Sequence, residues 1–260
     1  MDLNLFGHKA LVSGAWRGTG LIIAKALLAE GASVLVHGFT REQAETGCAE
    51  AGGGTPVWGD ITTDEGAATL LMMVADYAPD IDILINNYGT AAGGQWRDTN
   101  SAAWVEQYEH NVLSAQRLIQ GLLPGLRQRQ WGRIINLGTV GSTRPNNRMP
   151  HYYAAKGALA TMTISLAREL AGTGIRVNLV SPGLILTPEV EAQYLRRGQR
   201  EGWGSTWAEI EPHVARNIPI GRIVRREEIA HLICFLASPL SDALHGQNIR
   251  IDGGSLGVLT

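Results

Sequence analysis

Cysteine is almost absent from this chain, and so are the usual marks of secreted and membrane-spanning proteins. Among 260 residues there are two cysteines, Cys48 and Cys234, and they form no Cys-x-x-Cys pair. This pattern indicates two reduced thiols rather than a disulfide framework. No basic segment leads into a short apolar stretch at the start, and no apolar run is long enough to span a membrane. We therefore expect no signal peptide, no membrane partner and a cytoplasmic location.

An excess of charge and a cluster of metal ligands are also missing. The formal net charge is -2, which predicts no general affinity for nucleic acid. The seven histidines show no ligand-like spacing, so we expect no metal. No linker, internal repeat or low-complexity segment divides the chain. With 45% hydrophobic residues, residues 1–260 are expected to form one globular domain.

Short apolar runs rich in β-branched residues alternate with longer segments that have helical periodicity. Such alternation is typical of a parallel sheet covered by helices on both faces. The sequence thus predicts an α/β, doubly wound Rossmann fold. The expected strands are 9–15, 33–38, 56–60, 81–87, 132–138, 175–183 and 247–252. The expected helices are 18–32, 41–52, 64–78, 101–123, 151–170 and 226–238, with a less regular stretch at about 188–218.

A glycine-rich turn follows the first expected strand. The segment 13–20 reads SGAWRGTG and leads directly into an apolar helix. Backbone N–H groups at a helix N-terminus attract anions, and glycines let a pyrophosphate approach the backbone closely. The turn therefore predicts a dinucleotide site. Its expected members are Gly14, Trp16, Arg17, Gly18, Thr19 and Gly20.

The Gly-x3-Gly-x-Gly spacing resembles that of the short-chain dehydrogenase/reductase family, and further markers follow in that family's order over about residues 5–255. They are Asp60-Ile-Thr, Asn86-Asn87-Tyr88-Gly89, His110-Asn111-Val112, Tyr152-x3-Lys156, Ser181-Pro182-Gly183 and Asp252-Gly253-Gly254. The resemblance implies an oxidoreductase that uses a nicotinamide dinucleotide. It also implies that the cofactor contacts Asp60, Ile61, Asn87, Gly89, Tyr152, Lys156, Pro182, Gly183, Ile185 and Thr187.

The end of the second expected strand bears on the choice between NADP(H) and NAD(H). In dinucleotide folds an acid there binds the ribose 2′-hydroxyl. That position is Gly38, and Phe39 follows it, with no carboxylate at 37–41. Arg17 and Arg41 are nearby cations that suit a 2′-phosphate. NADP(H) is therefore favoured over NAD(H), although Phe39 stands where NADP-dependent relatives often carry arginine.

Two adjacent tyrosines, Tyr152 and Tyr153, precede Lys156, and both spacings bring a tyrosine beside the lysine on a helix. A nearby ammonium would lower the pKa of a tyrosine, which is about 10 in isolation. The stripe through Tyr152 and Lys156 continues in apolar residues and should face the sheet. Tyr153 begins a stripe of small residues suited to helix packing. Tyr152 is thus the expected acid, as the family resemblance also implies.

Two further catalytic residues are implied by the resemblance. Thr139 stands 13 residues before Tyr152, where the family usually has serine, and its hydroxyl can still bind a carbonyl oxygen. Asn111 would hold a water that passes protons from Lys156 to solvent. Asparagine at a helix kink is an alternative role for Asn111 that does not exclude the first.

The expected reaction is hydride transfer between NADP(H) and a ketone, sugar or hydroxy acid. Alternatives are a 3-oxoacyl thioester reductase of fatty-acid synthesis and a non-catalytic NADP(H)-binding sensor, since a fold alone does not fix function. Residues about 188–218 are expected to form a variable substrate lid. Polar residues at 144–148 suggest a polar or anionic substrate, although polar loops are also ordinary solvated surface. By resemblance the chain is a homo-oligomer, tetramer or dimer.

Overall fold

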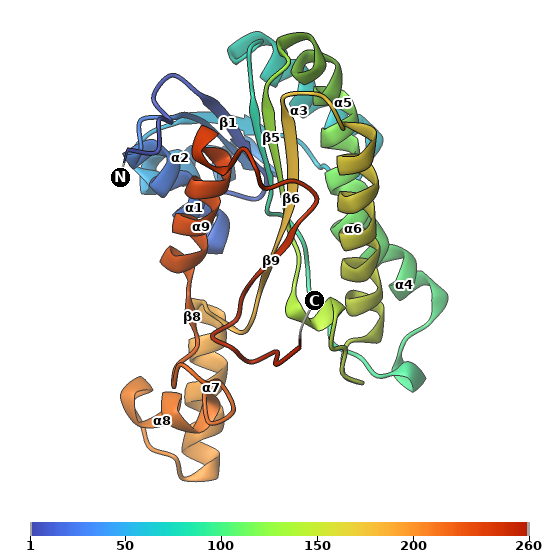
Figure 1. Ribbon diagram of the computed structural model, residues 1–260. Helices are drawn as coiled ribbons and strands as arrows, with labels where there is room; N and C mark the ends of the chain where they lie inside the picture. The colour runs from blue at the N-terminus through green and yellow to red at the C-terminus, as the bar shows by residue number, and fades with distance from the viewer. Residues whose placement is uncertain (1, 259–260) are drawn as a thin grey trace.

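In the computed structural model, which describes residues 2–258, seven strands form a parallel sheet in the order β3-β2-β1-β4-β5-β6-β9 (Figure 1). The strand β1 pairs with β2 on one side and β4 on the other, so the winding reverses beside β1. This confirms the predicted doubly wound fold. The strands are β1 (Lys9–Val12), β2 (Ser33–Gly38), β3 (Thr55–Trp58), β4 (Ile83–Asn86), β5 (Gly132–Leu137), β6 (Ile175–Pro182) and β9 (Asn248–Ile251).

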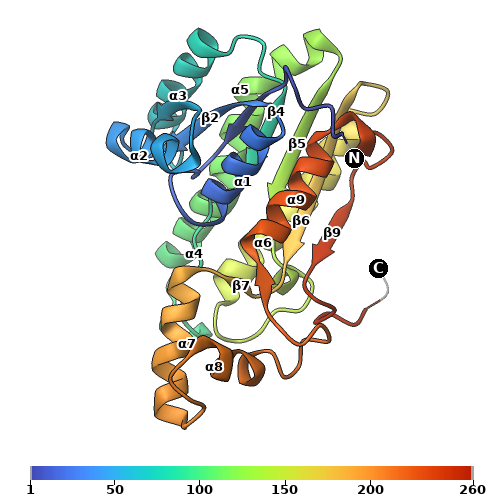
Figure 2. The same ribbon diagram turned by 90° about the vertical axis from the view of Figure 1, so that its left-hand side faces the viewer.

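Helices cover both faces of this sheet, as Figures 1 and 2 show. On one face lie α1 (Gly18–Ala29), α2 (Arg41–Ala51) and α9 (Arg226–Ala237). On the other lie α3 (Asp64–Tyr77), α5 (Ser114–Arg129) and α6 (Pro150–Glu169). The strands are therefore buried on both sides, and their side chains divide between two large apolar clusters. This explains why the strands read as nearly continuous apolar runs.

The helix predicted over 101–123 is interrupted. The structure has α4 (Ser101–Tyr108), a π-helical turn η2 (Glu109–Leu113), and then α5, which continues beyond the predicted end despite Pro124. Within the turn, Asn111 Nδ2 donates to the carbonyls of Thr90 and Gln107, at 2.9 and 3.0 Å. Asn111 therefore does satisfy a local distortion of the helix, and π-turns of this kind are frequent at functional sites.

The stretch predicted as less regular at 188–218 is largely helical. It contains α7 (Pro188–Glu201) and α8 (Trp207–Val214), which protrude at the foot of the molecule in Figures 1 and 2. Thr187 caps α7, and Thr206 with Glu209 forms a capping box on α8. Both caps are visible in the sequence, as Thr187 before α7 and as Thr206-x-x-Glu209 at the start of α8. The aromatic and charged residues scattered through this stretch hid the helical periodicity. A small pair of strands, β7 (Ile185–Leu186) and β8 (Val224–Arg225), joins the segment to the body.

Several short elements complete the described chain: η1 (Trp96–Asp98), η3 (Val140–Ser142) and η4 (Pro239–Ser241). No helix within residues 2–258 is long and apolar enough to cross a membrane. The same residues contain no cluster of three potential metal-ligating side chains. Cys48 and Cys234 are free thiols.

Candidate active site

The glycine turn lies between the end of β1 and the start of α1, at the carboxyl edge of the sheet. No side chain caps the N-terminus of α1, and no acidic residue lies in its first turn. Gly14 and Gly18 have left-handed backbone angles, with φ of +63° and +62°. A Cβ atom on Gly20 would lie 2.5 Å from both the Gly14 carbonyl oxygen and Asn87 Nδ2. The turn is thus closely folded and leaves a helix N-terminus available for an anion, which fits a dinucleotide pyrophosphate.

His37, at the end of β2, holds this turn from below. Its Nδ1 accepts a hydrogen bond from the Gly14 N–H at 2.9 Å, so Nε2 carries the ring hydrogen and donates to the Gly59 carbonyl, also at 2.9 Å. The side chain is fully buried, and burial lowers the pKa of His37 to about 4. His37 is therefore neutral at physiological pH and ties the glycine turn to the end of β3. The sequence analysis did not single it out.

We expect this histidine to make the protein acid-sensitive. Because the folded-state pKa is about 4 against 6.5 for an ordinary histidine, the unfolded chain binds more protons between these values. The free energy of unfolding is therefore unaffected by the titration of His37 above pH 6.5. It decreases as the pH falls from 6.5 towards 4, by up to about 3 kcal/mol. Urea unfolding of wild type and His37→Gln at pH 7 and pH 4.5 measures this contribution. An equal loss in both proteins would show that other groups cause it.

The packing at the end of β2 explains why Gly38, and not an acidic residue, occupies the position that would face the ribose 2′-hydroxyl. A Cβ on Gly38 would lie 2.6 Å from the Ala44 backbone nitrogen, so the close approach of α2 requires glycine. The missing carboxylate is therefore a packing requirement as well as a feature compatible with a 2′-phosphate. Arg41 lies over the Trp58 ring at 4.5 Å, and Arg17 over Trp16 at 4.6 Å. Both guanidinium groups are thus supported by indole rings.

Tyr88, which replaces a small residue in the Asn-Asn-x-Gly marker, has a defined place. Its ring packs edge-on against Phe39, with centroids 4.8 Å apart. Its backbone N–H donates to Ser13 Oγ at 3.0 Å, and a Cβ on Gly14 would lie 3.2 Å from Tyr88 Cβ. The large side chain is therefore accommodated between the glycine turn and Phe39 without displacing Asn87, whose amide bonds the Ser13 carbonyl at 2.9 Å.

The remaining predicted cofactor residues also lie near the carboxyl ends of strands. Some of their side chains are exposed to solvent and others are buried. Asp60 is exposed after β3 and accepts two hydrogen bonds from Thr62. Ile61 is buried in the core, so only its backbone can face a ligand. β6 ends at Pro182, and the chain continues through Gly183 and Ile185 to Thr187, whose hydroxyl caps α7.

Tyr152 and Thr139 meet where α6 begins beside the end of β5. Both residues line one cavity, and the Thr139 hydroxyl is close enough to influence the phenol of Tyr152. Burial raises the pKa of Tyr152 to about 12, with a smaller contribution from Tyr153, while the nearby Thr139 hydroxyl opposes the rise. Desolvation thus dominates the pKa of Tyr152, and Lys156 is not among the groups that shift it. Tyr152 is consequently protonated and able to donate at neutral pH.

Lys156 lies one turn further along α6 and is buried. Its Nζ donates to the Leu137 carbonyl at 2.7 Å, and burial lowers the pKa of Lys156 to about 8. A Cβ on Gly89 would lie 2.9 Å from Lys156 Nζ and 2.5 Å from Asn111 Oδ1, so the two polar groups converge on Gly89. Asn111 Oδ1 is buried and accepts no hydrogen bond from the described residues. The structure thus brings all four predicted catalytic residues to one region.

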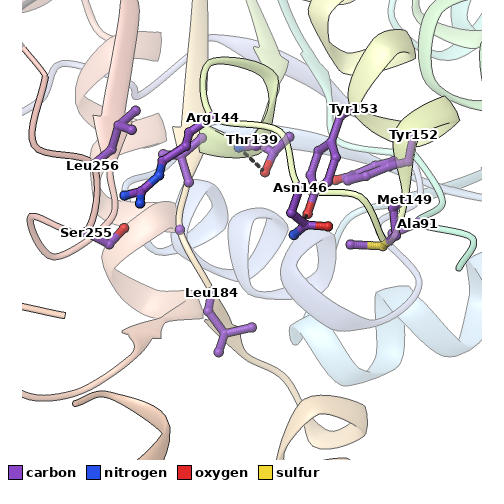
Figure 3. A pocket seen from close by; sticks show the side chains of 13 residues that line it. Ala91, Thr139, Arg144, Asn146, Met149, Tyr152, Tyr153, Leu184, Ser255 and Leu256 are labelled. Atoms are coloured by element: carbon purple, nitrogen blue, oxygen red, sulfur yellow. Dashed lines mark hydrogen bonds between the residues drawn. The ribbon is translucent and has the colours of Figure 1, made fainter. Parts of the chain in front are cut away.

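A cavity of about 360 Å³ opens in front of Tyr152 and Thr139 (Figure 3). Tyr153 also lines it, where its hydroxyl accepts a hydrogen bond from Asn146 Nδ2 at 2.9 Å and its ring covers Gly141. Its predicted role as helix packing is therefore incomplete. Ala91 and Met149 come from loops at 90–98 and 142–151, whose variable, polar sequences predict substrate binding. Sequence reasoning missed the other wall residues, which are Val140, Gly141, Leu184, Ser255 and Leu256.

Comparison with known proteins identifies the protein family to which this chain belongs. A family profile described as "Enoyl-(Acyl carrier protein) reductase" matches residues 14–255. An uncharacterized oxidoreductase, YvaG of Bacillus subtilis, is 36% identical, with 98% of each chain covered. D-beta-hydroxybutyrate dehydrogenase of Cupriavidus necator is 35% identical over 96% of this chain and 98% of its own.

Solved structures give the same result. The crystal structure of L-sorbose reductase from Gluconobacter frateurii, complexed with NADPH and L-sorbose, superposes with a TM-score of 0.93 at 30% identity, covering all of both chains. The chain belongs to the short-chain dehydrogenase/reductase family. It is an oxidoreductase that transfers a hydride between a nicotinamide cofactor and a carbonyl or secondary alcohol.

One feature distinguishes the catalytic centre of this short-chain dehydrogenase/reductase from the usual family pattern. Thr139 replaces serine, and its hydroxyl accepts from the Gly141 N–H at 3.2 Å while its backbone carbonyl accepts from Ser142 Oγ at 2.7 Å. These bonds fix the threonine in an extended conformation at the start of η3. Thr139 thus keeps a hydroxyl on the wall of the cavity that Tyr152 also lines.

Proposed function

We propose that this protein is an NADP(H)-dependent reductase of small polar carbonyl compounds. The observation that carries the proposal is that Thr139 and Tyr152 line the wall of one small cavity, with Lys156 one helical turn further along α6 and hydrogen-bonded to the Leu137 carbonyl at the end of β5. The bound cofactor supplies or accepts the hydride. Thr139 orients the carbonyl oxygen, and Tyr152 donates a proton to that oxygen as negative charge develops. Lys156 binds the nicotinamide ribose and returns a proton to Tyr152.

Asn111 completes this proton path. Its unpaired Oδ1 faces the same space as Lys156 Nζ, next to Gly89, and can accept a hydrogen bond in a chain of proton transfers. The amide nitrogen cannot turn away, because it donates to the Thr90 and Gln107 carbonyls. The π-turn therefore fixes the oxygen in the direction that a relay needs. The same asparagine serves both the helix distortion and the proposed proton path.

The cofactor-binding residues are assigned by the same proposal. Gly14, Gly18, Thr19 and Gly20 bind the pyrophosphate, and Gly38, Asp60, Ile61, Asn87 and Gly89 bind the adenosine side. Pro182, Gly183, Ile185 and Thr187 bind the nicotinamide side. Support for NADP(H) over NAD(H) comes from Arg17 and Arg41, which the indoles of Trp16 and Trp58 support, and from the NADPH bound by the similar L-sorbose reductase.

Replacing both arginines should change cofactor preference. In Arg17→Gln/Arg41→Gln we expect the Kd of NADPH to rise about 10- to 100-fold, because charge-assisted hydrogen bonds to the 2′-phosphate are lost. The Kd of NADH should change less than about threefold. Fluorescence titration of both cofactors measures this, with the exposed Arg168→Gln as a control for the loss of a surface arginine elsewhere. Equal weakening of both cofactors would contradict a contact with the 2′-phosphate.

Further parts of the proposal concern the whole molecule. The protruding segment of α7 and α8 acts as a substrate lid, supported by its few buried residues, Gly198 and Ile210. The protein forms a homo-oligomer, tetramer or dimer, for which the exposed Val105, Tyr108 and Ile164 on α4 and α6 provide apolar surface. The two free thiols are in keeping with a cytoplasmic location.

The proposed function is tested by NADPH and NADH oxidation with ketoses, oxo acids and 3-oxoacyl thioesters as substrates. We expect turnover with NADPH and a small polar carbonyl compound, and its loss in Tyr152→Phe. Turnover restricted to 3-oxoacyl thioesters would favour the reductase of fatty-acid synthesis, a reaction named for the 34% identical FabG of Vibrio cholerae. Binding of NADPH without turnover of any carbonyl would support a sensor instead.

A further inference from the structure

The substrate cavity contains one cation and no acid. Arg144 is the single charged side chain among the residues that line it. The remaining walls are apolar or carry neutral hydroxyl and amide groups. In Figure 3, Arg144 and Tyr152 lie on opposite sides of Thr139. A substrate whose carbonyl group binds at Thr139 and Tyr152 would therefore place another of its groups towards a guanidinium.

Arg144 has a fixed position relative to Thr139. Four residues separate them, and the first three form the turn η3, in which Thr139 Oγ1 accepts from the Gly141 N–H. The backbone N–H groups of Thr143 and Arg144 both donate to the Val140 carbonyl, at 3.1 and 3.0 Å. The following loop is held by the hydrogen bond from Asn146 to Tyr153. Arg144 thus emerges from a structured turn beside the catalytic hydroxyl.

The guanidinium has no partner within residues 2–258: it makes neither an ion pair nor a side-chain hydrogen bond there. Asp252, which precedes Ser255 on the facing wall, does not neutralise it. The Asp252 carboxylate accepts from the Gly254 N–H, Ser255 Oγ and the Leu256 N–H. A second cation, Arg148, lies on the same loop close enough to Tyr153 to act on its hydroxyl electrostatically. Two arginines therefore lie on the loop beside the cavity, and in the described part of the chain Asp252 forms no ion pair with either of them.

We propose that the substrates of this enzyme are short oxo acids, and the corresponding hydroxy acids in reverse, whose carboxylate pairs with Arg144. This inference rests on the proposed function above. A guanidinium presents parallel N–H donors that match both oxygens of a carboxylate. The hydride adds to the carbonyl carbon, the Tyr152 proton goes to the carbonyl oxygen, and the carboxylate is unchanged. An oxo acid, NADPH and a proton thus give a hydroxy acid and NADP⁺.

The size of the cavity and the single cation argue for a carboxylate over other substrate groups. About 360 Å³ is near the lower end of the range for small-molecule sites. Any substrate that covers Arg144 removes water from its guanidinium, which costs free energy. A carboxylate compensates for this cost with its negative charge, whereas a neutral sugar or thioester does not. Arg144 is exposed, so its pair with a bound carboxylate would act mainly through the two parallel hydrogen bonds of a guanidinium and would contribute about 1 kcal/mol.

The test compares short 2-oxo, 3-oxo and 4-oxo acids with their methyl esters and with a neutral ketose. In wild type we expect kcat/KM with NADPH to be about 3- to 10-fold higher for the best acid than for its ester. In Arg144→Gln this preference should disappear through a higher KM for the acid, while the ester is little affected. Arg148→Gln removes a charge from the same loop but not from the cavity wall, and should retain most of the preference.

Each contrary result has a distinct meaning. If wild type reduces esters, ketoses or 3-oxoacyl thioesters as well as the acids, or if Arg144→Gln lowers kcat/KM equally for acid and ester, the oxo-acid proposal is overturned and the reductase assignment remains. If Arg148→Gln removes the preference as fully as Arg144→Gln, general charge and not pairing is responsible, which also overturns it. If wild type reduces no carbonyl compound, the reductase proposal fails and the substrate class fails with it.

Discussion

Tyr152→Phe should lower kcat for carbonyl reduction by about 10²- to 10⁴-fold, the range that a positioned general acid contributes. The substitution removes one hydroxyl from the cavity wall that Thr139 also lines. The aromatic ring stays, so the Kd of NADPH should change by less than about threefold. Because the pKa of Tyr152 is raised to about 12, the wild-type tyrosine is a proton donor throughout the neutral range. Steady-state kinetics and fluorescence titration measure the two quantities.

Tyr153→Phe is the matched control, since it removes a hydroxyl from the adjacent residue of the same cavity. That hydroxyl is bonded to Asn146, a surface loop residue, and not to Thr139. We expect kcat within about fivefold of wild type and a moderate rise in KM from loosening of the loop. Loss of turnover in Tyr153→Phe with activity retained in Tyr152→Phe would reverse the assignment. Thermal unfolding of both variants checks that neither loss reflects misfolding.

The choice between these tyrosines shows how much the sequence could predict. Parallel strands, each ending in a marker residue, imply that those markers meet at one edge of the sheet, and they do. The stripe through Lys156, Leu159 and Thr163 is buried, as its helical spacing predicted. Ile164, in the stripe that Tyr153 begins, is exposed. Periodicity determines which way a side chain faces because helix geometry is nearly constant.

Features that depend on long-range contacts could not be predicted in this way. Gly38 was interpreted through the charge of a cofactor, but the approach of α2 to its Cα decides the residue there. The π-turn arises from bonds between Asn111 and the Thr90 and Gln107 carbonyls, one of which is distant in sequence. The walls formed by Ser255 and Leu256 require the C-terminal segment to fold back across the cavity.

The lowered pKa of Lys156 could not be predicted from the sequence, because it depends on how deeply the ammonium is buried. Substitution of this lysine should also have a large effect on the reaction rate. Lys156→Met should reduce kcat by about 10²- to 10³-fold, as expected when a preorganised polar group is removed from a reacting site. The substitution keeps an unbranched side chain in a buried position and removes an ammonium that burial disfavours. It also leaves the Leu137 carbonyl without its partner, at a cost of about 1–3 kcal/mol in stability.

The pH dependence separates the charge of Lys156 from its packing. The pKa of Lys156 is about 8, so its ammonium is present below pH 8 and lost above it. In wild type, kcat/KM for reduction should therefore fall as pH rises through 8, well before Tyr152 loses its proton. In Lys156→Met the residual rate should be flat from pH 6.5 to 9.5, because no group in the proton path titrates there. A wild-type profile that stays flat to pH 10 would contradict the role of the ammonium, whereas a parallel decline in both proteins would assign the titration to another group.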